Sequence, residues 1–466
     1  MPLLLLLYNL LFAPVFLLLL PGYLARMIRR GGWRAGFGQR FGFYPKTWRA
    51  RLAAEPTPRL WIQAVSVGEM FIALKLVAAL RQRAPELRLL LSTTTTTGFA
   101  LAQERVASAG WDDEGTVAVL YTPLDFLPCA ALAWRALARP AGVVVVEGGL
   151  WPNLLALARR DGRPAALVNA RLSPRSERRF RRARALTAPL LFRPLSLLTA
   201  PEPADRARWT ALGADPECIQ ITGSMKFDDS GVAESAGSSA AAADERRERL
   251  RAELAAHGLQ LDPARPVLLA GSTHAGEELL VAQQWRRLRQ RDARLADLGL
   301  VIAPRHVERT GAVRAQLEAA LGLRGIARSE LGKKSFDEVA GADFVLLDTT
   351  GELRDWFALA TVVFIGKSLA THVSGGQNPV EPLAAGRPVI FGPRMENFAD
   401  IVAQLLAVGG AVQVPEAADA LGDACAHLLV NADARAQLVA RGQTVLASHH
   451  GAAARTAAAV LALLAR

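Results

Sequence analysis

The sequence predicts two α/β domains, each with a parallel sheet wrapped by helices. Three observations support this fold class. Short, β-rich apolar runs alternate with longer amphipathic stretches from Leu60 to about Ala200, the same alternation resumes at Pro266, and a small, polar stretch without periodicity separates the two series. This alternation is typical of parallel sheets covered by helices. The 466 residues can also fill two ordinary domain cores, at about 150 residues per domain.

The first series predicts six strands, within LWIQAVS, LRLLLS, VAVLYT, AGVVVVEGG, AALVNA and LSLLTA. Helical patterns run up to Leu80 after the first of these and again after Gly98. The runs are apolar throughout, as expected of strands that are buried on both faces. This half is therefore predicted to be Rossmann-like.

The second series predicts five more strands, within PVLLAGST, LGLVIAP, DFVLLDTT, TVVFIGKS and RPVIFGP. Before it, Asp228–Ala243 (DDSGVAESAGSSAAAA) has the composition of a flexible segment. The stretch from Ala417 is predicted to be helical and to cover the second domain, and its return to the first domain stays open. Two Rossmann-like halves that meet at a cleft are the simplest assembly. The predicted parts are a membrane anchor (1–22), an N-terminal Rossmann-like domain (23–227), a linker and connecting helix (228–264), a C-terminal Rossmann-like domain (265–440) and a C-terminal helix (441–466).

The first twenty residues, MPLLLLLYNLLFAPVFLLLL, predict a membrane anchor. No charged residue occurs from Leu3 to Leu20, and roughly 18–20 apolar residues match the thickness that a helix must cross. Five arginines follow immediately and no acidic residue occurs until Glu55, which predicts by the positive-inside rule that the rest of the chain is cytoplasmic. A cleaved signal would need a basic start and a clear cleavage site, and neither is evident. Pro14 keeps a re-entrant or monotopic insertion open. The arginines are Arg26, Arg29, Arg30, Arg34 and Arg40.

A formal net charge of +12 fits nucleic acid, an anionic membrane or an acidic substrate. The basic residues cluster in Arg26–Arg40 and Arg171–Arg184 without interleaved aromatics, which favours anionic lipid headgroups over nucleic acid. Three cysteines without CxxC spacing suggest no disulfide framework or zinc site, and therefore a reducing compartment. No histidines are spaced for a metal, and His449-His450 is interpreted as a solvated helix end. The absence of a Walker lysine motif and of a complete GxGxxG disfavours ATPases and nicotinamide enzymes.

Polar residues at strand exits are the candidates for chemistry, because ligands of parallel sheets bind where strands end and helices begin. Glu69 follows the run LWIQAVS and could act as a general base, although its spacing from Ser66 also fits a capping box. The run STTTTTG (92–98) could bind an anion or sugar, but threonines are also common caps. Glu147 follows four valines, and a functional or ion-paired role is favoured because an unpaired carboxylate is rarely buried.

The second half offers three more strand exits. Ser272, Thr273 and His274 open a helix with two acids in its first turn, which suits a phosphate or plain capping. Arg305 and His306 follow the next strand, where an arginine can bind a phosphate or carboxylate or simply lie at the surface. The segment SGGQNPVEPLAAG (374–386) predicts Asn378 as helix cap, Pro379 as first and Glu381 as third helical residue. A role for Glu381 at sugar hydroxyls is favoured over a capping box.

The chain resembles the Kdo transferases of lipopolysaccharide synthesis, which transfer 3-deoxy-D-manno-octulosonic acid (Kdo). The resemblance covers nearly the whole length, in family order. It is carried by WIQAVSVGE, STTTTTG, YTPLD, EGGLWPN, LVNARLSPRS, ITGSMKFD, GSTHAGEE, APRHVER, DTTGEL and SGGQNPVEP.

The resemblance implies a GT-B fold and metal-independent, inverting transfer without a cofactor. Glu69 matches the family's general base and Glu147 an acid near the acceptor. Two departures stand out. Gly148 and Gly149 replace a threonine and a second acid of the usual ETELWPN, and Gln377 replaces the histidine of GGHN. The residues that the resemblance assigns to the CMP-sugar are Ser272, Thr273, Arg305, His306, Gly351, Glu352, Gly376, Asn378 and Glu381.

The implied activity is transfer of Kdo from CMP-Kdo to a glucosamine hydroxyl of a tetraacylated lipid A precursor. The implied location is the cytoplasmic face of the inner membrane, where a single-pass anchor and anionic lipids hold the enzyme. The alternatives are another nucleotide-sugar transferase or epimerase of the same fold, and a non-catalytic membrane-anchored scaffold.

Overall fold

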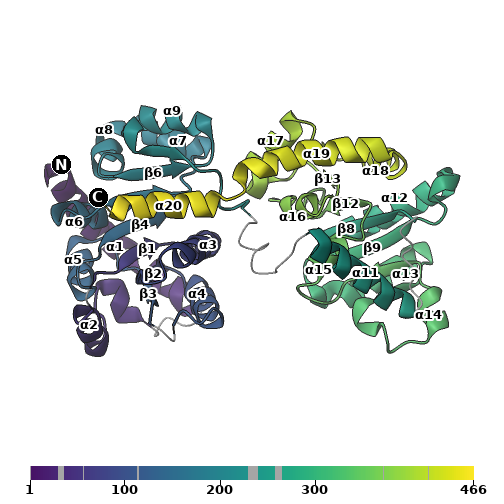
Figure 1. Cartoon of the computed structure of the whole chain (residues 1–466), viewed down its shortest axis with the longest axis horizontal. Helices are drawn as coiled ribbons and strands as arrows, with labels where there is room; N and C mark the ends of the chain where they lie inside the picture. The colour runs from purple at the N-terminus through teal and green to yellow at the C-terminus, as the bar shows by residue number, and fades with distance from the viewer. Residues whose placement is uncertain are drawn as a thin grey trace. The chain divides into compact units, whose positions relative to one another are not determined.

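The computed structural model describes residues 2–29, 36–55, 57–112, 115–228, 240–257, 265–370, 372–417 and 419–465. The chain forms two compact units. Unit 1 comprises Met1–Val232 together with His449–Arg466, and unit 2 comprises Ala233–Ser448. The chain therefore leaves unit 1, builds unit 2 and returns to unit 1 (Figure 1).

Unit 1 contains a parallel sheet of seven strands in the order β3-β2-β1-β4-β5-β6-β7. All six strands predicted for this half are present. The seventh, β7, was not predicted, because it is only three residues long and lies at the sheet edge. The strands are β1 (Leu60–Gln63), β2 (Leu89–Thr93), β3 (Val117–Tyr121), β4 (Gly142–Val146), β5 (Ala165–Val168), β6 (Leu197–Ala200) and β7 (Ile219–Ile221).

Helices cover both faces of this sheet, as the continuous apolar runs predicted. Successive residues of one strand point to opposite faces, so Val143 packs in one core cluster and Val144 in the other. The first cluster involves α5 (Leu127–Ala136), α6 (Pro152–Arg160) and α9 (Pro203–Leu212), and the second involves α3 (Val67–Arg83), α4 (Thr96–Ser108) and α20 (Ala452–Leu464).

The last helix, α20, completes unit 1 although it follows unit 2 in the chain (Figure 1). Ala453, Ala457 and Val460 are buried in the same cluster as Ile62 of β1. Asp228 fixes the start of the helix, because its carboxylate accepts hydrogen bonds from the N–H groups of Gly451 (3.0 Å) and Ala453 (2.6 Å). The return to the first domain, which the sequence left open, is therefore present.

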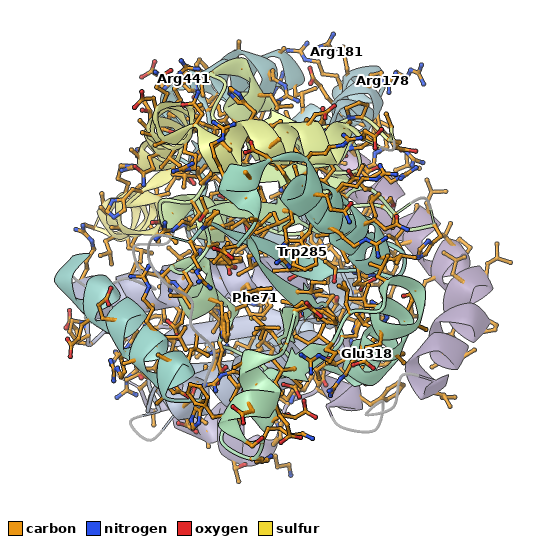
Figure 2. All side chains as sticks on the ribbon, turned by 90° about the vertical axis from the view of Figure 1, so that its right-hand side faces the viewer. Phe71, Arg178, Arg181, Trp285, Glu318 and Arg441 are labelled. Carbon is orange, nitrogen blue, oxygen red and sulfur yellow. The ribbon has the colours of Figure 1, made fainter. Side chains whose placement is uncertain are left out.

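The remaining helices of unit 1 lie at its periphery. They are α1 (Pro2–Arg29), η1 (Phe37–Phe41), α2 (Lys46–Ala53), α7 (Pro174–Arg182), α8 (Arg184–Thr187), the π-helical turn η2 (Ala188–Phe192) and η3 (Pro216–Cys218). Helix α7 carries much of the predicted basic cluster, and its Arg178 and Arg181 extend outward from the ribbon (Figure 2).

Unit 2 contains a second parallel sheet of seven strands, in the order β10-β11-β9-β8-β12-β13-β14. The five predicted strands are present, and the two outermost ones, β10 and β14, were missed because they have only three and two residues. The strands are β8 (Val267–Thr273), β9 (Gly299–Pro304), β10 (Gly325–Ala327), β11 (Phe344–Leu346), β12 (Val362–Ile365), β13 (Val389–Phe391) and β14 (Val412–Gln413).

The core of unit 2 includes Trp285 of α12, which is buried between that helix and the sheet (Figure 2). The helices of this unit are α11 (Ala240–Ala256), α12 (Glu277–Arg291), η4 (Ala293–Leu295), η5 (Val307–Arg309), α13 (Thr310–Leu321), η6 (Arg328–Glu330), α14 (Phe336–Ala340), α15 (Leu353–Phe357), α16 (Val380–Ala384), η7 (Glu396–Phe398), α17 (Ala399–Ala407), α18 (Ala420–Val430) and α19 (Ala432–His449).

Two sequence interpretations are wrong because each side chain contacts a residue that is distant in sequence. His449 is not solvated: it is buried, and its Nδ1 accepts a hydrogen bond from the N–H of Ser224 (3.1 Å). Arg40 does not belong to a surface cluster, because its guanidinium lies over the Tyr121 ring and donates to the carbonyl of Thr94 (2.6 Å). Residues 30–35 of that cluster lie outside the described residues.

The flexible segment predicted for 228–243 is wrong at both of its ends. Asp228 is buried and caps α20, and α11 already begins at Ala240. Residues 229–239 lie outside the described residues.

The strand order of each sheet reverses near its middle. In unit 1 the reversal lies between β1 and β4, and in unit 2 it lies between β8 and β12. Crevices outside the carboxyl ends of strands at such points are the usual ligand sites of open α/β sheets. The loops that follow these four strands are therefore where a functional site is expected.

In unit 2 the loops at the reversal touch at Gly366, which directly follows β12. A Cβ atom on this residue would lie 2.4 Å from the carbonyl oxygen of Ser272 and 2.5 Å from the Cα of Thr273. Only a glycine lets the two backbones approach this closely.

We expect Gly366→Ala to lower the free energy of unfolding of the protein by roughly 1–3 kcal/mol, as overpacking usually does. Urea denaturation measures this loss. The control is Gly311→Ala in α13, where a Cβ meets no atom within 4 Å and an alanine favours the helix. Equal stability of the two variants would contradict the close approach.

Candidate active site

Glu69 lies at the strand reversal of unit 1, in the first turn of α3. Ser66 caps this helix, since its Oγ accepts a hydrogen bond from the N–H of Glu69 (3.2 Å). The Glu69 carboxylate in turn accepts one from the N–H of Val65 (2.7 Å). The capping interpretation is therefore correct for Ser66, and the same contacts fix the Glu69 carboxylate beside the end of β1.

The surroundings of Glu69 make it a weaker acid than usual. Burial is the largest cause and raises its pKa to about 7, against the opposing hydrogen bond from Val65. The negative charge of Glu147 raises the pKa further. A carboxyl group with a pKa near 7 can accept and release a proton at neutral pH, as a general base must.

Glu147 follows β4 directly, on the other side of the strand reversal. Its backbone has a positive φ of 62°, which is uncommon for a residue other than glycine. The carboxylate accepts a hydrogen bond from Nδ2 of Asn169 (3.2 Å) and lies 3.8 Å from Nη1 of Arg171. It is 24% exposed, so this acid is paired and still accessible.

Sequence reasoning did not select Asn169 and Arg171 as site residues. Asn169 follows β5, has a positive φ of 53° and accepts a hydrogen bond from the N–H of Met225 (2.8 Å). The strand-exit criterion would have found it at the end of the run AALVNA. Arg171 was counted only as part of a basic cluster. Its pairing with Glu147 joins the loops after β5 and β4, which the sequence alone does not bring together.

The two glycines after Glu147 bring the loop of β4 against the loop of β1. The Gly149 carbonyl accepts a hydrogen bond from Nε2 of Gln63 (3.3 Å), and a Cβ on Gly149 would lie 3.0 Å from a methyl group of Val65. Gly148 faces open space. Gly149 therefore brings the loop that carries Glu147 against Val65, which precedes α3 and Glu69.

The threonine run has a structural role at the positions where its contacts are visible. Oγ1 of Thr94 donates to the Val65 carbonyl (2.7 Å), and Oγ1 of Thr95 caps α4 by accepting from the N–H of Gly98 (3.1 Å). The Thr94 hydroxyl therefore supports the loop that leads to α3 and Glu69, and the Thr95 hydroxyl supports the start of α4.

In unit 2 a buried carboxylate, Glu277, organises the strand reversal. It is 1% exposed and accepts hydrogen bonds from five backbone N–H groups at 2.6–3.2 Å. These belong to His274, Lys367, Ser368, Leu369 and Ala370. Glu277 therefore ties the loop after β8 to the loop after β12. The sequence had shown it only as one of two acids in a first helical turn.

Of the residues predicted at the end of β8, Thr273 is engaged inside the unit. It is fully buried, and its hydroxyl donates to Oε1 of Glu278 (3.0 Å), which also pairs with Arg309 (2.9 Å). Ser272 has a positive φ of 54° and is half-buried. Thr273 thus supports the loop, and Ser272 lies nearer to solvent.

Nitrogen-bearing side chains gather at the exits of β8 and β9. The rings of His274 and His306 meet edge to face with centroids 5.7 Å apart, and Arg305 and His306 are exposed. Nε2 of His274 is buried and has no hydrogen-bond partner among the described residues. Burial, with help from nearby positive charges, lowers the pKa of His274, so its imidazole is neutral at pH 7. Such a group can donate to a ligand oxygen.

Gly351 and Glu352 lie after β11, the strand next to β9. Gly351 is exposed, with a positive φ of 90°. The Glu352 carboxylate accepts from Nε of Arg328 (3.1 Å) and from Oγ1 of Thr349 (2.9 Å). Glu352 is therefore held in place at the same carboxyl edge as the other predicted residues of unit 2.

The glycine turn after β12 packs tightly on its neighbours. Gly376 has a positive φ of 64°, and a Cβ there would lie 2.3 Å from the sulfur of Met395. Helix α16 begins at Val380, one residue later than predicted, with Pro379 in the cap position. Asn378 still serves this helix end: its Oδ1 accepts from the N–H of Val380 (3.0 Å), and its Nδ2 donates to Glu381 (2.8 Å).

Known proteins resemble this chain in sequence over most of its length. A family model described as 3-deoxy-D-manno-octulosonic-acid transferase (kdotransferase) matches residues 35–229. The 3-deoxy-D-manno-octulosonic acid transferase of Haemophilus influenzae is 32% identical over 425 residues, covering 91% of this chain and 90% of that protein. The enzyme of the same name from Bordetella pertussis is 34% identical over 434 residues, covering 92% and 93%.

Among solved structures, UDP-GlcNAc 2-epimerase from Neisseria meningitidis bound to UDP-GlcNAc is similar, with a TM-score of 0.54. It is 12% identical and covers 87% of this chain and all of that one. At this identity the likeness concerns the fold alone, and it confirms the predicted GT-B type with two Rossmann-like units. Because relatives above 30% identity match nearly the whole chain, the protein belongs to the 3-deoxy-D-manno-octulosonic acid transferase family and is a glycosyltransferase of lipopolysaccharide biosynthesis.

Proposed function

We propose that the protein transfers Kdo from CMP-Kdo, with inversion, to a glucosamine hydroxyl of a tetraacylated lipid A precursor. The observation that carries this proposal is Glu69, a half-buried carboxyl group at the strand reversal of unit 1 whose pKa is raised to about 7. A group of this kind suits the removal of a proton from a hydroxyl that attacks a sugar.

In the proposed reaction Glu69 accepts the proton of the acceptor hydroxyl while the oxygen of that hydroxyl bonds to the anomeric carbon of Kdo. The bond from that carbon to the phosphate oxygen breaks at the same time, and CMP leaves with the electron pair. A single displacement of this type inverts the anomeric centre. The N–H of Val65 holds the carboxylate in place, and Glu147 with Arg171 contacts the acceptor.

Unit 2 binds the donor in this proposal. Arg305, His306 and His274 stabilise the charge that develops on the leaving phosphate. Asn378 and Glu381 contact hydroxyls of the donor. Ser272, Thr273, Gly351, Glu352 and Gly376 complete the donor site by shaping the loops at the carboxyl edge of the sheet.

We place the enzyme at the cytoplasmic face of the inner membrane, where the lipid acceptor is embedded. Helix α1 contains a span, Leu3–Gly22, with mean hydropathy 2.6, long and apolar enough to cross a membrane. The exposed arginines of α7 (Figure 2) suit anionic lipids and the phosphates of the acceptor.

We expect Glu69→Gln to lower kcat for Kdo transfer by roughly 10²–10⁴-fold, the usual contribution of a general base. The amide keeps an oxygen for the Val65 N–H, so thermal unfolding should not change. Mass spectrometry of the lipid product, with CMP release, measures the loss. Glu104→Gln on the exposed side of α4 is the control and should remain active. A folded Glu69→Gln enzyme with full activity would rule out the base.

The pH dependence should report Glu69. The deprotonated form is the base, so kcat/KM for the acceptor should rise with pH through about 7. Glu147→Gln removes a negative charge that raises this pKa, so the rise should move to lower pH. An unchanged or higher midpoint would contradict the coupling of the two acids.

Donor specificity can be tested by binding of the nucleotide alone. CMP should raise the melting temperature of the full-length protein more than UDP does. His274→Ala should bind CMP about ten-fold more weakly, because it loses one hydrogen bond to a charged phosphate. Isothermal titration calorimetry measures this affinity. His427→Ala, exposed on α18 of the same unit, is the control. Stronger stabilisation by UDP would favour another nucleotide-sugar enzyme.

A further inference from the structure

Helix α1 is bound to unit 1 along one side, in spite of its apolar composition. Tyr8 and Asn9, the two polar residues of its apolar span Leu3–Gly22, both hydrogen-bond to the unit. The Tyr8 hydroxyl donates to the Asp125 carboxylate (3.0 Å). The amides of Asn9 and Asn153 donate to one another, at 2.8 and 3.0 Å, and the Leu127 N–H donates to Asn9 Oδ1 (2.8 Å).

The partners of these two residues belong to the interior of unit 1. Asp125 and Asn153 are buried, and Asp125 also accepts from the N–H groups of Asn153 and Leu154 at the start of α6 (3.2 Å each). The ring of Phe12 stacks on that of Phe126, with centroids 5.5 Å apart, at the start of α5. Tyr8, Asn9 and Phe12 therefore form one docked face on the N-terminal ends of α5 and α6.

The opposite face of α1 is uncovered and consists of leucines. The leucines that lie on it are 48–79% exposed. No residue of the apolar span Leu3–Gly22 is fully buried. Next to it, Leu127 of α5 is 40% exposed, so the apolar surface continues onto the unit. The most exposed members of this leucine face are Leu3, Leu10, Leu17 and Leu18.

Docking and crossing of the membrane by α1 exclude each other. Arg26 lies 18 residues after Tyr8, which is about 27 Å along an α-helix. If α1 crossed a hydrocarbon core of about 30 Å with Arg26 at the cytoplasmic surface, Tyr8 would lie near the far leaflet. Asp125 and the N-terminal ends of α5 and α6 would then have to lie there too. Charges and open backbone are costly at that depth.

We infer that α1 lies in the plane of the membrane, docked on unit 1, with its leucine face in the boundary between headgroups and acyl chains. The inference rests on the proposed membrane location and replaces the predicted single-pass anchor with the monotopic insertion that Pro14 had left open. A lipid bilayer is the expected occupant because arginines follow the apolar span in the sequence, and basic residues beside such a span are attracted to anionic lipid headgroups. The acceptor would then meet unit 1 at the surface where its lipid is embedded.

A pair of cysteines tests docking in native membranes. In the full chain, Asn9→Cys with Asn153→Cys should be joined by a short bis-methanethiosulfonate, detected as linked peptides by mass spectrometry. Leu18→Cys on the leucine face, paired with Asn153→Cys, is the matched control and should not link. Failure of the first pair to link, in protein that still binds CMP, would overturn the docking.

A second test leaves the docked face intact. A membrane-impermeant maleimide applied to spheroplasts should not modify Leu3→Cys, although it should do so after detergent solubilisation. Modification in intact spheroplasts would mean that α1 crosses the membrane. Ser108→Cys, exposed on α4, reports the side on which unit 1 lies. Its modification in spheroplasts would reject the cytoplasmic location of the proposed function, separately from the docking.

The occupant of the leucine face is tested by Leu10→Cys alone. If lipid covers this face, the Leu10→Cys protein should run as a monomer on a non-reducing gel after oxidation of native membranes. A disulfide-linked dimer would mean that a second copy of the chain covers the face, and would overturn the assignment to lipid.

Discussion

The reversal of strand order in each parallel sheet is the constraint on which the rest of the structure depends. Neighbouring loops diverge to opposite faces of the sheet only at such a point, so polar side chains can gather there without filling the core. Glu69 and Glu147 flank the reversal of unit 1, and Glu277 joins the two loops at the reversal of unit 2. The apolar strands decide where chemistry is possible, and the residues just beyond them decide which chemistry it is.

Most of the fold could be predicted because its signal is local. Long apolar runs such as GVVVV of β4 identify buried strands by themselves. The strands that were missed, β7, β10 and β14, have two or three residues at or near sheet edges, so their pairing partners define them more than their composition does. The errors at Arg40, His449 and Asp228 have the same origin, since each side chain is fixed by a contact far away in the chain.

The candidate site divides in the same way. Glu69 and Glu147 were found because each follows a strand that the sequence identifies. Arg171 and Glu277 were not selected, because their roles arise from loops that only the fold brings together. Thr273 lies at a strand exit as predicted, and its hydroxyl holds Glu278, while its contact with a ligand stays a prediction. A position at a strand exit therefore identifies a site more securely than it assigns a role within that site.

The placement of α20 has a consequence for how the chain is made. The sheet face that receives Ala457 and Val460 lacks part of its cover until α20 has left the ribosome. Unit 2 is complete before then, although unit 1 begins first, so the usual order in which domains mature from the N-terminus is reversed here. During synthesis, the nascent strands of unit 1 must therefore wait with part of this apolar face open until α20 has been made.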